Sequence, residues 1–370
     1  MFASLLTVAS LALAATASWI GNINFNSPSL QHREYWASTQ LNFTHGVASG
    51  DPYPNSVILW TRLAPSFASD RSNVTVFGTV EFYCHETGDD ANLTCKVDRG
   101  TAYTTSDIDS TIKAVAKKLR PFTTYYQFTQ CGTANHSPIG RTKTSPSADQ
   151  KIDKIRLIVY SCSRFPNGYF HAYGIAARKD RVDHKIHLGD YIYETSAGVR
   201  GRDARATNPS RAILTLYDYR TTIAQYGTDA DSLLSHQRFA WIAAWDDHEA
   251  AYNRYRDEFS AMNNTEESFV RSSGLNMDDN LLMWRDFHMG TLLDLTMLDT
   301  HNYNRSITDL SWSTEYIYNI LNDAGRSLMG SQQENWFHKT LISSKKRGIA
   351  SSVGQSIKSA MKKTVHMNQT

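Results

Sequence analysis

Four apolar segments after residue 150 each lead into acidic, histidine or cysteine residues, and this pattern constrains the fold more than any other feature. The segments are 154–161, 185–190, 238–249 and 291–304. A stretch with helical spacing, 167–180, separates the first two. Alternating strands and helices are typical of a layered α/β domain, in which strand ends meet at one edge of a sheet. We expect such a domain over residues 152–355, with 154–161 as a strand buried on both faces.

The side chains at these strand ends are types that bind metal ions and phosphate. An Asp190 carboxylate can bridge two cations, and a Tyr193 phenolate or a Cys162 thiolate suits a trivalent ion such as Fe(III). Two metal ions can neutralise the oxygens of a phosphate ester and activate a water. A neighbouring His248 can contact the phosphate or protonate the leaving group. The strand ends together predict a metal site for phosphate ester cleavage.

Single residues of this set also have plainer interpretations. Asp190 taken alone is equally consistent with a capping acid at a strand end. Cys162 taken alone fits a buried, inert residue better than a ligand. Asp299 and His301 fit a surface loop or groups that orient metal ligands. The metal interpretation therefore depends on the whole set of strand ends.

Residues 40–145 have the pattern of an all-β domain. Short segments rich in β-branched and aromatic residues are separated by turn residues, and no long helical pattern interrupts them. The segments are 55–65, 73–84, 94–105 and 122–132. This spacing predicts an immunoglobulin- or fibronectin-like β-sandwich, followed by a linker at 145–149.

Cysteine placement adds one local prediction. Cys84 and Cys95 flank ten residues rich in Gly, Asp and Asn, which predicts a hairpin whose strands a disulfide could link. Cys131 is either free or paired elsewhere.

Residues 1–17 have the pattern of a secretory signal peptide. Residues 2–17 are uncharged and apolar or small, and they end in a small-x-small pattern before Ser18. A membrane anchor is the alternative, but the run is short for a span. Seven glycosylation sequons agree with export: Asn42, Asn73, Asn92, Asn135, Asn263, Asn304 and Asn368. We expect a secreted protein, extracellular or in the cell wall, with no stable membrane span after cleavage.

The sequence resembles the PhoD-type alkaline phosphatases, the alkaline phosphatase D family of metallophosphoesterases. The matching motifs keep their order and spacing over roughly residues 40–350. They lie at 43–52, 58–62, 161–163, 187–194, 219–220, 245–249, 298–300 and 330–337. Purple acid phosphatases share the Gly-Asp-x-x-Tyr spacing, but the Cys162 segment and the run 245–249 favour the PhoD type.

The resemblance implies a calcineurin-like metallophosphoesterase domain with an iron–calcium site. The implied metal ligands are Cys162, Asp190, Tyr193 and Asp247. The first three would bind Fe³⁺, Asp190 would also bridge to Ca²⁺, and Asp247 would bind Ca²⁺. His248 and Arg220 would contact the phosphate oxygens. The resemblance thereby reverses the plainer interpretation of Cys162.

Two departures from the family pattern stand out. The family usually has an arginine at the position of His301. Its members continue beyond residue 355 to a Gly-Asp-x-His segment that supplies further metal ligands, whereas residues 356–370 do not resemble them. The resemblance therefore implies an incomplete phosphatase domain followed by an unrelated tail.

Three functions stay open on the sequence. The first is a secreted phosphomonoesterase or phosphodiesterase using metal-activated hydroxide, with a phospholipase D-like phosphodiesterase as the main variant. The second is a catalytically incomplete fragment. The third, an adhesion glycoprotein built on the β-sandwich, leaves the strand-end motifs unexplained. A formal net charge of +2 gives no reason to expect nucleic acid as a stable partner, and we expect a monomer that takes a phosphate ester as substrate.

Overall fold

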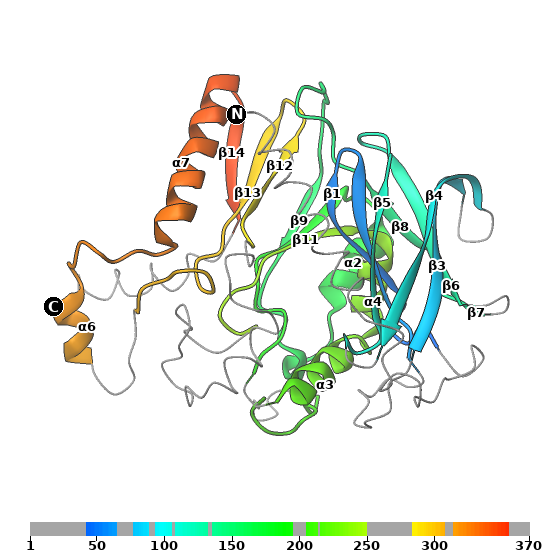
Figure 1. Ribbon diagram of the computed structural model, residues 1–370, viewed down its shortest axis with the longest axis horizontal. Coiled ribbons are helices and arrows are strands. Elements are labelled where there is room, and N and C mark those ends of the chain that lie inside the picture. Colours follow the sequence, from blue (N-terminus) through cyan, green and yellow to red (C-terminus); the bar gives the residue numbers. More distant parts are fainter. Residues whose placement is uncertain are drawn as a thin grey trace, which may run out of the picture.

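The computed structural model describes residues 42–64, 77–88, 93–105, 108–131, 135–194, 205–213, 215–249, 283–307 and 314–354. Within these residues the strands form three sheets (Figure 1). The first sheet has six strands and runs through the middle of the molecule. Its strands, in order across the sheet, are β5 (Thr111–Lys117), β2 (Ser56–Arg62), β1 (Val47–Tyr53), β11 (Ala240–Ala243), β10 (His184–His187) and β9 (Leu157–Tyr160).

The first sheet joins the two parts of the chain that the sequence predicts as separate domains. Strands β5, β2 and β1 are antiparallel, whereas β11, β10 and β9 are parallel to one another. The two halves meet where β1 pairs in parallel with β11, with Gly50 opposite Trp241. A side chain at Gly50 would approach the Trp241 carbonyl oxygen to 3.2 Å, so glycine eases this pairing. The result is one mixed sheet.

The second sheet covers the β5–β2 end of the first. It contains β4 (Leu93–Thr105), β3 (Phe77–Gly88), β6 (Thr124–Cys131) and β7 (Asn135–His136), with β8 (Gly140–Lys143) also paired to β6. Side chains from both sheets form one buried cluster that includes Val57, Leu59, Phe82 and Tyr125. The four predicted β segments are all strands, while β1, β5, β7 and β8 are additional. The immunoglobulin- or fibronectin-like connectivity stays a prediction.

Helices cover one face of the parallel strands. They are α2 (His171–Lys179), α3 (Leu216–Tyr226) and α4 (Ala230–Arg238), after the short 3₁₀ turn η3 (Phe165–Asn167). Phe170, Tyr173 and Tyr226 pack there with Phe239 and Trp241 in an aromatic-rich core. The predicted helix at 167–180 and the strands within 185–190, 238–249 and 291–304 are confirmed.

The third sheet covers the opposite face. It consists of β12 (Arg285–Met289), β13 (Leu293–Met297) and β14 (Ala350–Gly354). Ile186 and Ile242 of the first sheet pack against Phe287, Leu295 and Met297 of the third. The long helix α7 (Gly330–Arg347) lies beside β14, and α6 (Thr314–Ile320) lies farther out (Figure 1). This layering confirms the predicted α/β architecture.

Two local predictions are wrong, and the predicted linker is more closely packed than its sequence suggests. Strand β9 lies at the end of its sheet and Val159 is 53% exposed, so this strand is not buried on both faces. The hairpin of β3 and β4 exists, but Cys84 is a free, buried thiol whose neighbour on β4 is Asp98. At the expected linker, Ser145 is buried and its hydroxyl donates to the Pro52 carbonyl, so this link is packed against the β layer.

Two further predictions concern the two ends of the chain. The predicted signal peptide, residues 1–17, and the tail 356–370 lie outside them. Within the described residues, every helix is too short or too polar to cross a membrane.

Candidate metal and phosphate site

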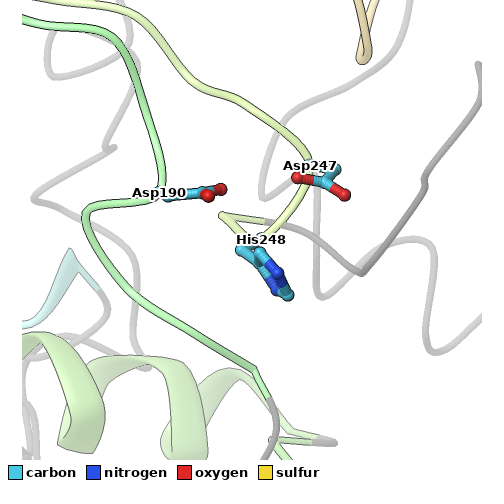
Figure 2. Close-up of side chains that lie close together, drawn as sticks. All are labelled: Asp190, Asp247 and His248. Carbon is cyan, nitrogen blue, oxygen red and sulfur yellow. The ribbon is translucent and has the colours of Figure 1, made fainter. Parts of the chain in front are cut away.

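The candidate site lies where β9, β10 and β11 end. Cys162 follows β9, Asp190 follows β10, and Asp247 and His248 follow β11. Because these strands are parallel, their ends meet at the same edge of the sheet. Figure 2 shows Asp190, Asp247 and His248 approaching one another from two loops. One potential ligand atom from each lies within 4.8 Å of the others, which is close enough to share one cation.

The turn that presents Asp190 has an uncommon backbone. Asp190 has a φ of 56°, and the preceding Gly189 has a φ of 98°. A side chain on Gly189 would come within 2.5 Å of the Asp246 backbone nitrogen. Glycine is therefore required for the β10 loop to lie so close to the β11 loop. The Gly-Asp pair identified in the sequence thus has a specific structural reason.

Two predicted iron ligands contact the same oxygen of Asp190. The Cys162 Sγ donates to Asp190 Oδ2 at 3.4 Å, and the Tyr193 hydroxyl donates to it at 3.3 Å. Burial raises the pKa of Tyr193, and the charge of Asp190 raises it further. Partial burial also raises the pKa of the Cys162 thiol. Both groups therefore hold their protons toward the carboxylate, and a cation bound there would have to displace these protons.

The Asp190 carboxylate fits a cation-binding role. Its Oδ1 is buried and has no hydrogen-bond partner among the described residues. Burial raises the pKa of Asp190, and the neighbouring carboxylates of Asp246 and Asp247 add to the increase, while His248 opposes it. A buried carboxylate oxygen with no donor, surrounded by further acids, is the environment that a positive ion stabilises. The residues present thus fit a metal ion.

His248 is held by a buried acid. Its Nδ1 lies 2.7 Å from Oε2 of Glu194, which is fully buried, and its ring packs 4.3 Å from the Tyr193 ring. Burial acts to lower the pKa of His248, but the hydrogen bond to Glu194 and the nearby carboxylates outweigh burial and raise it to about 8. The imidazole is therefore mainly protonated at neutral pH and can donate to an anion.

Glu249 ties the two central loops together. Its carboxylate accepts hydrogen bonds from the backbone N–H groups of Asp190 at 3.0 Å and Asp246 at 2.7 Å, and also from that of Tyr191. Burial raises the pKa of Glu249 to about 7. Glu194 and Glu249 close the runs 187–194 and 245–249, and neither was predicted as a metal ligand or a phosphate contact. Their position as the acid that ends each motif is the signal that could have identified them.

A second group of potential ligands shares Asp247. One atom each from Asp246, Asp247 and His301 lie within 4.8 Å of one another. His301 Nε2 is 3.0 Å from Asp246 Oδ1, and the Arg305 guanidinium contacts the His301 ring. His301 thus lies at the site, whereas Asp299 accepts backbone N–H bonds from His301 and Asn302 and shapes their turn. Asp246 belongs to the predicted strand-end run 245–249, but only its neighbour Asp247 was predicted as a metal ligand.

Arg220 is the remaining residue with a predicted phosphate contact. It lies on α3 and is half-buried. Thr215 is the N-cap of this helix, and Thr215 and Asp218 form reciprocal capping hydrogen bonds. The predicted phosphate contact of Arg220 stays a prediction.

The layered fold and its strand-end acids, imidazole, thiol and phenol define a protein of the metallophosphoesterase class. The chain belongs to the PhoD-like phosphatase family. The family's phosphatase model matches residues 157–366, and the model of its N-terminal domain matches residues 29–146. The predicted resemblance is confirmed, and the match also includes residues 356–366, which the sequence analysis placed in an unrelated tail.

Two known proteins illustrate this relationship. The chain is 32% identical over 320 residues to alkaline phosphatase D of Bacillus subtilis (strain 168), which covers 82% of this chain and 54% of that protein. A solved structure of PhoD matches with a TM-score of 0.70 and 29% identity, covering 81% of this chain and 60% of that one. The chain thus spans about half the length of the curated relative.

Proposed function

We propose that this protein hydrolyses phosphate esters at the strand-end site. The observation that carries the proposal is the convergence of Cys162, Tyr193, Asp247 and His248 on Asp190. Membership of a phosphatase family supports the same chemistry. The substrate is a phosphate monoester or diester, and the site residues alone do not select between them.

We propose Fe³⁺ and Ca²⁺ as the metal ions. Cys162, Asp190 and Tyr193 would hold iron, because a thiolate, a carboxylate and a phenolate supply the negative charge that a trivalent ion requires. Asp190 and Asp247 would hold calcium, which prefers carboxylate oxygens. When bound, the metal ions would supply charge neutralisation and a water that is deprotonated near neutral pH.

The protein's own groups would orient the phosphate. His248 would donate a hydrogen bond from its imidazolium to a phosphate oxygen, while Glu194 fixes its ring from the opposite side. Glu249 would hold Asp190 and the β11 loop at a constant separation through its backbone hydrogen bonds. Arg220 would add a second positive charge to the phosphate.

Purified chain can be tested with an aryl phosphate monoester and a bis-aryl phosphate, each with iron and calcium present. Turnover in either arm that Asp190→Ala abolishes supports the proposal. Preference for the diester would favour the phospholipase D-like variant. A folded sample that binds iron but turns over neither ester would contradict hydrolysis and favour the incomplete-fragment alternative.

We also propose that the protein is exported and glycosylated. Asn42 and Asn304, which lie in sequons, are both exposed, and this supports their accessibility to glycosylation. Expression in a glycosylating host, followed by N-terminal sequencing and enzymatic removal of N-glycans, tests both points. A secreted product that begins at Ser18 and loses mass on deglycosylation is expected. An intracellular product that keeps residues 1–17 would contradict export.

A further inference from the structure

We propose that His187 is a positioning residue that fixes the Cys162 loop and the Asp190 loop relative to each other. This inference rests on the proposed metal-binding roles of Cys162 and Asp190. His187 is the last residue of β10 and is 1% exposed. It begins the motif 187–194 but was not among the residues predicted to bind metal or phosphate.

One ring nitrogen of His187 contacts the Asp190 loop. The backbone N–H of Gly189 donates to His187 Nδ1 at 3.3 Å. Because a backbone N–H can only donate, Nδ1 must accept, and the proton of the neutral ring is on Nε2. Burial, with the nearby Lys185 adding to it, lowers the pKa of His187 to about 3, so the ring is neutral.

The other ring nitrogen contacts the Cys162 loop. His187 Nε2 lies 2.9 Å from the Ser163 hydroxyl and 3.0 Å from the Tyr173 hydroxyl, and these two hydroxyls also contact each other. The Nε2–H is thus available to donate to Ser163, while Tyr173 reaches the same point from α2. A single imidazole therefore hydrogen-bonds to the loop after β9 and to the loop after β10.

The two loops also hydrogen-bond to each other directly. The Ser163 N–H donates to the Asp190 carbonyl at 2.7 Å, and the Cys162 N–H donates to the Gly189 carbonyl at 3.1 Å. Together with the two His187 contacts, these bonds form one set of hydrogen bonds that links the two loops. It spans the residues whose side chains meet at the candidate site, Cys162 and Asp190.

Such a set is needed because both predicted ligands have a strained backbone. Cys162 has a φ of 61° and Asp190 a φ of 56°, a region that residues other than glycine seldom adopt. Strained residues keep such a conformation only where their surroundings restrain them from several sides. The ring of His187 is itself immobilised, because it stacks on Trp241 with centroids 5.7 Å apart and meets the edge of Tyr191.

His184 provides a matched control for His187. It is the first residue of the same strand and is equally buried. Its two ring nitrogens have no hydrogen-bond partner among the described residues. Replacing either histidine by phenylalanine removes a buried imidazole from β10, but only the change at His187 removes contacts with the two loops.

The test compares His187→Phe with His184→Phe in two measurements. The first is hydrogen exchange of the amides at 161–164 and 188–191 in the metal-free protein. The second is the affinity for Fe³⁺, obtained by titration with iron alone. We expect His187→Phe to speed exchange in both segments at least tenfold and to lower iron affinity roughly 10- to 100-fold. We expect His184→Phe to change neither.

Two further variants keep the test decisive. Ser163→Ala removes one hydroxyl and replaces His187→Phe if that variant does not fold, with the same direction of change expected. His187→Asn retains an acceptor for Gly189 and should recover part of the protection at 188–191 but not at 161–164. Unchanged exchange in both His187→Phe and Ser163→Ala, or equal changes in His184→Phe, would overturn the proposal. If the unmodified chain binds no iron, the proposed metal role fails, while the exchange measurement still decides the positioning role.

Discussion

Two cysteines show how differently the β layer and the strand-end loops use the same type of residue. Cys84 lies between the strands of the β layer, is 0% exposed, and has its pKa raised to about 12 by burial. Cys162 is exposed, has a left-handed backbone, and directs its thiol toward Asp190. Both cysteines have an aspartate nearby, which is Asp98 for Cys84 and Asp190 for Cys162.

The groups around each cysteine, rather than the thiol itself, therefore decide what that cysteine can do. Cys84 packs with apolar side chains such as Val57 and Phe82, so it fills volume in the core. Cys162 meets a carboxylate and lies in the same site as Tyr193, Asp247 and His248, so it belongs to a potential ligand set. Four substitutions test this contrast, in order of decreasing effect.

Asp190→Asn should have the largest effect. It replaces the carboxylate on which Cys162, Tyr193 and His248 converge by an uncharged amide, so iron affinity and kcat/KM for an aryl phosphate should fall by more than roughly 100-fold. Metal analysis after gel filtration and initial rates measure both. Asp98→Asn, beside the other cysteine, is the matched control and should leave both unchanged. Equal losses in the two variants would mean that both aspartates act through the stability of the fold and that Asp190 has no separate role in binding iron.

Cys162→Ala should lower iron affinity roughly 10- to 100-fold without changing the unfolding temperature. The thiol is exposed, so its loss leaves no buried cavity. Iron titration and thermal unfolding of the same samples separate the two effects. Cys84→Ala serves as the control, since it should leave iron affinity unchanged. Full iron affinity in Cys162→Ala would remove this residue from the ligand set.

Glu194→Gln should lower the pKa of His248 from its value of about 8 by roughly one to two units. The Glu194 carboxylate stabilises the imidazolium, so an uncharged amide lets the proton leave at lower pH. The protonated fraction at pH 7 should therefore fall. An NMR titration of His248 in the metal-free protein measures this shift, with the exposed Glu315→Gln as control. An unchanged pKa would show that Glu194 is not the dominant partner.

Cys84→Ala should have the smallest effect, a loss of roughly 1 kcal/mol in the free energy of unfolding. The loss should be the same with and without a reducing agent, because Cys84 is a free thiol. Denaturant unfolding under both conditions measures it. A loss of roughly 2–4 kcal/mol that appears only without reductant would instead indicate the disulfide that the hairpin spacing suggested.

Much of the fold could be predicted from local sequence pattern. The helix around 167–180 and strands β10, β11 and β13 follow from apolar runs and their spacing. The pattern could not show that β9 lies at the end of its sheet, because an apolar run has the same appearance at the edge and in the centre. It also could not show that β1 pairs with β11, since residues so far apart in sequence meet only in the assembled sheet.

The residues of the candidate site were likewise predicted only in part from the sequence. The residue types at the strand ends, and the family resemblance they support, identified Cys162, Asp190, Tyr193, Asp247 and His248. The structure brings these together, places His301 at the site and adds Asp246, Glu194 and Glu249. Glu194 and Glu249 end their sequence motifs, but only the structure shows which groups their carboxylates contact. Arg220 was identified by resemblance alone, and its contact with phosphate stays a prediction.

The chemical groups that the strands carry at their ends follow from the sequence, because strand–loop periodicity is a local property of the chain. Which of these groups meet depends on the tertiary structure, since parallel pairing of β9, β10 and β11 aligns their ends at one edge. It also sets the surroundings of the two cysteines. Burial among apolar side chains leaves Cys84 inert, and a strained turn against a carboxylate exposes Cys162 to the site.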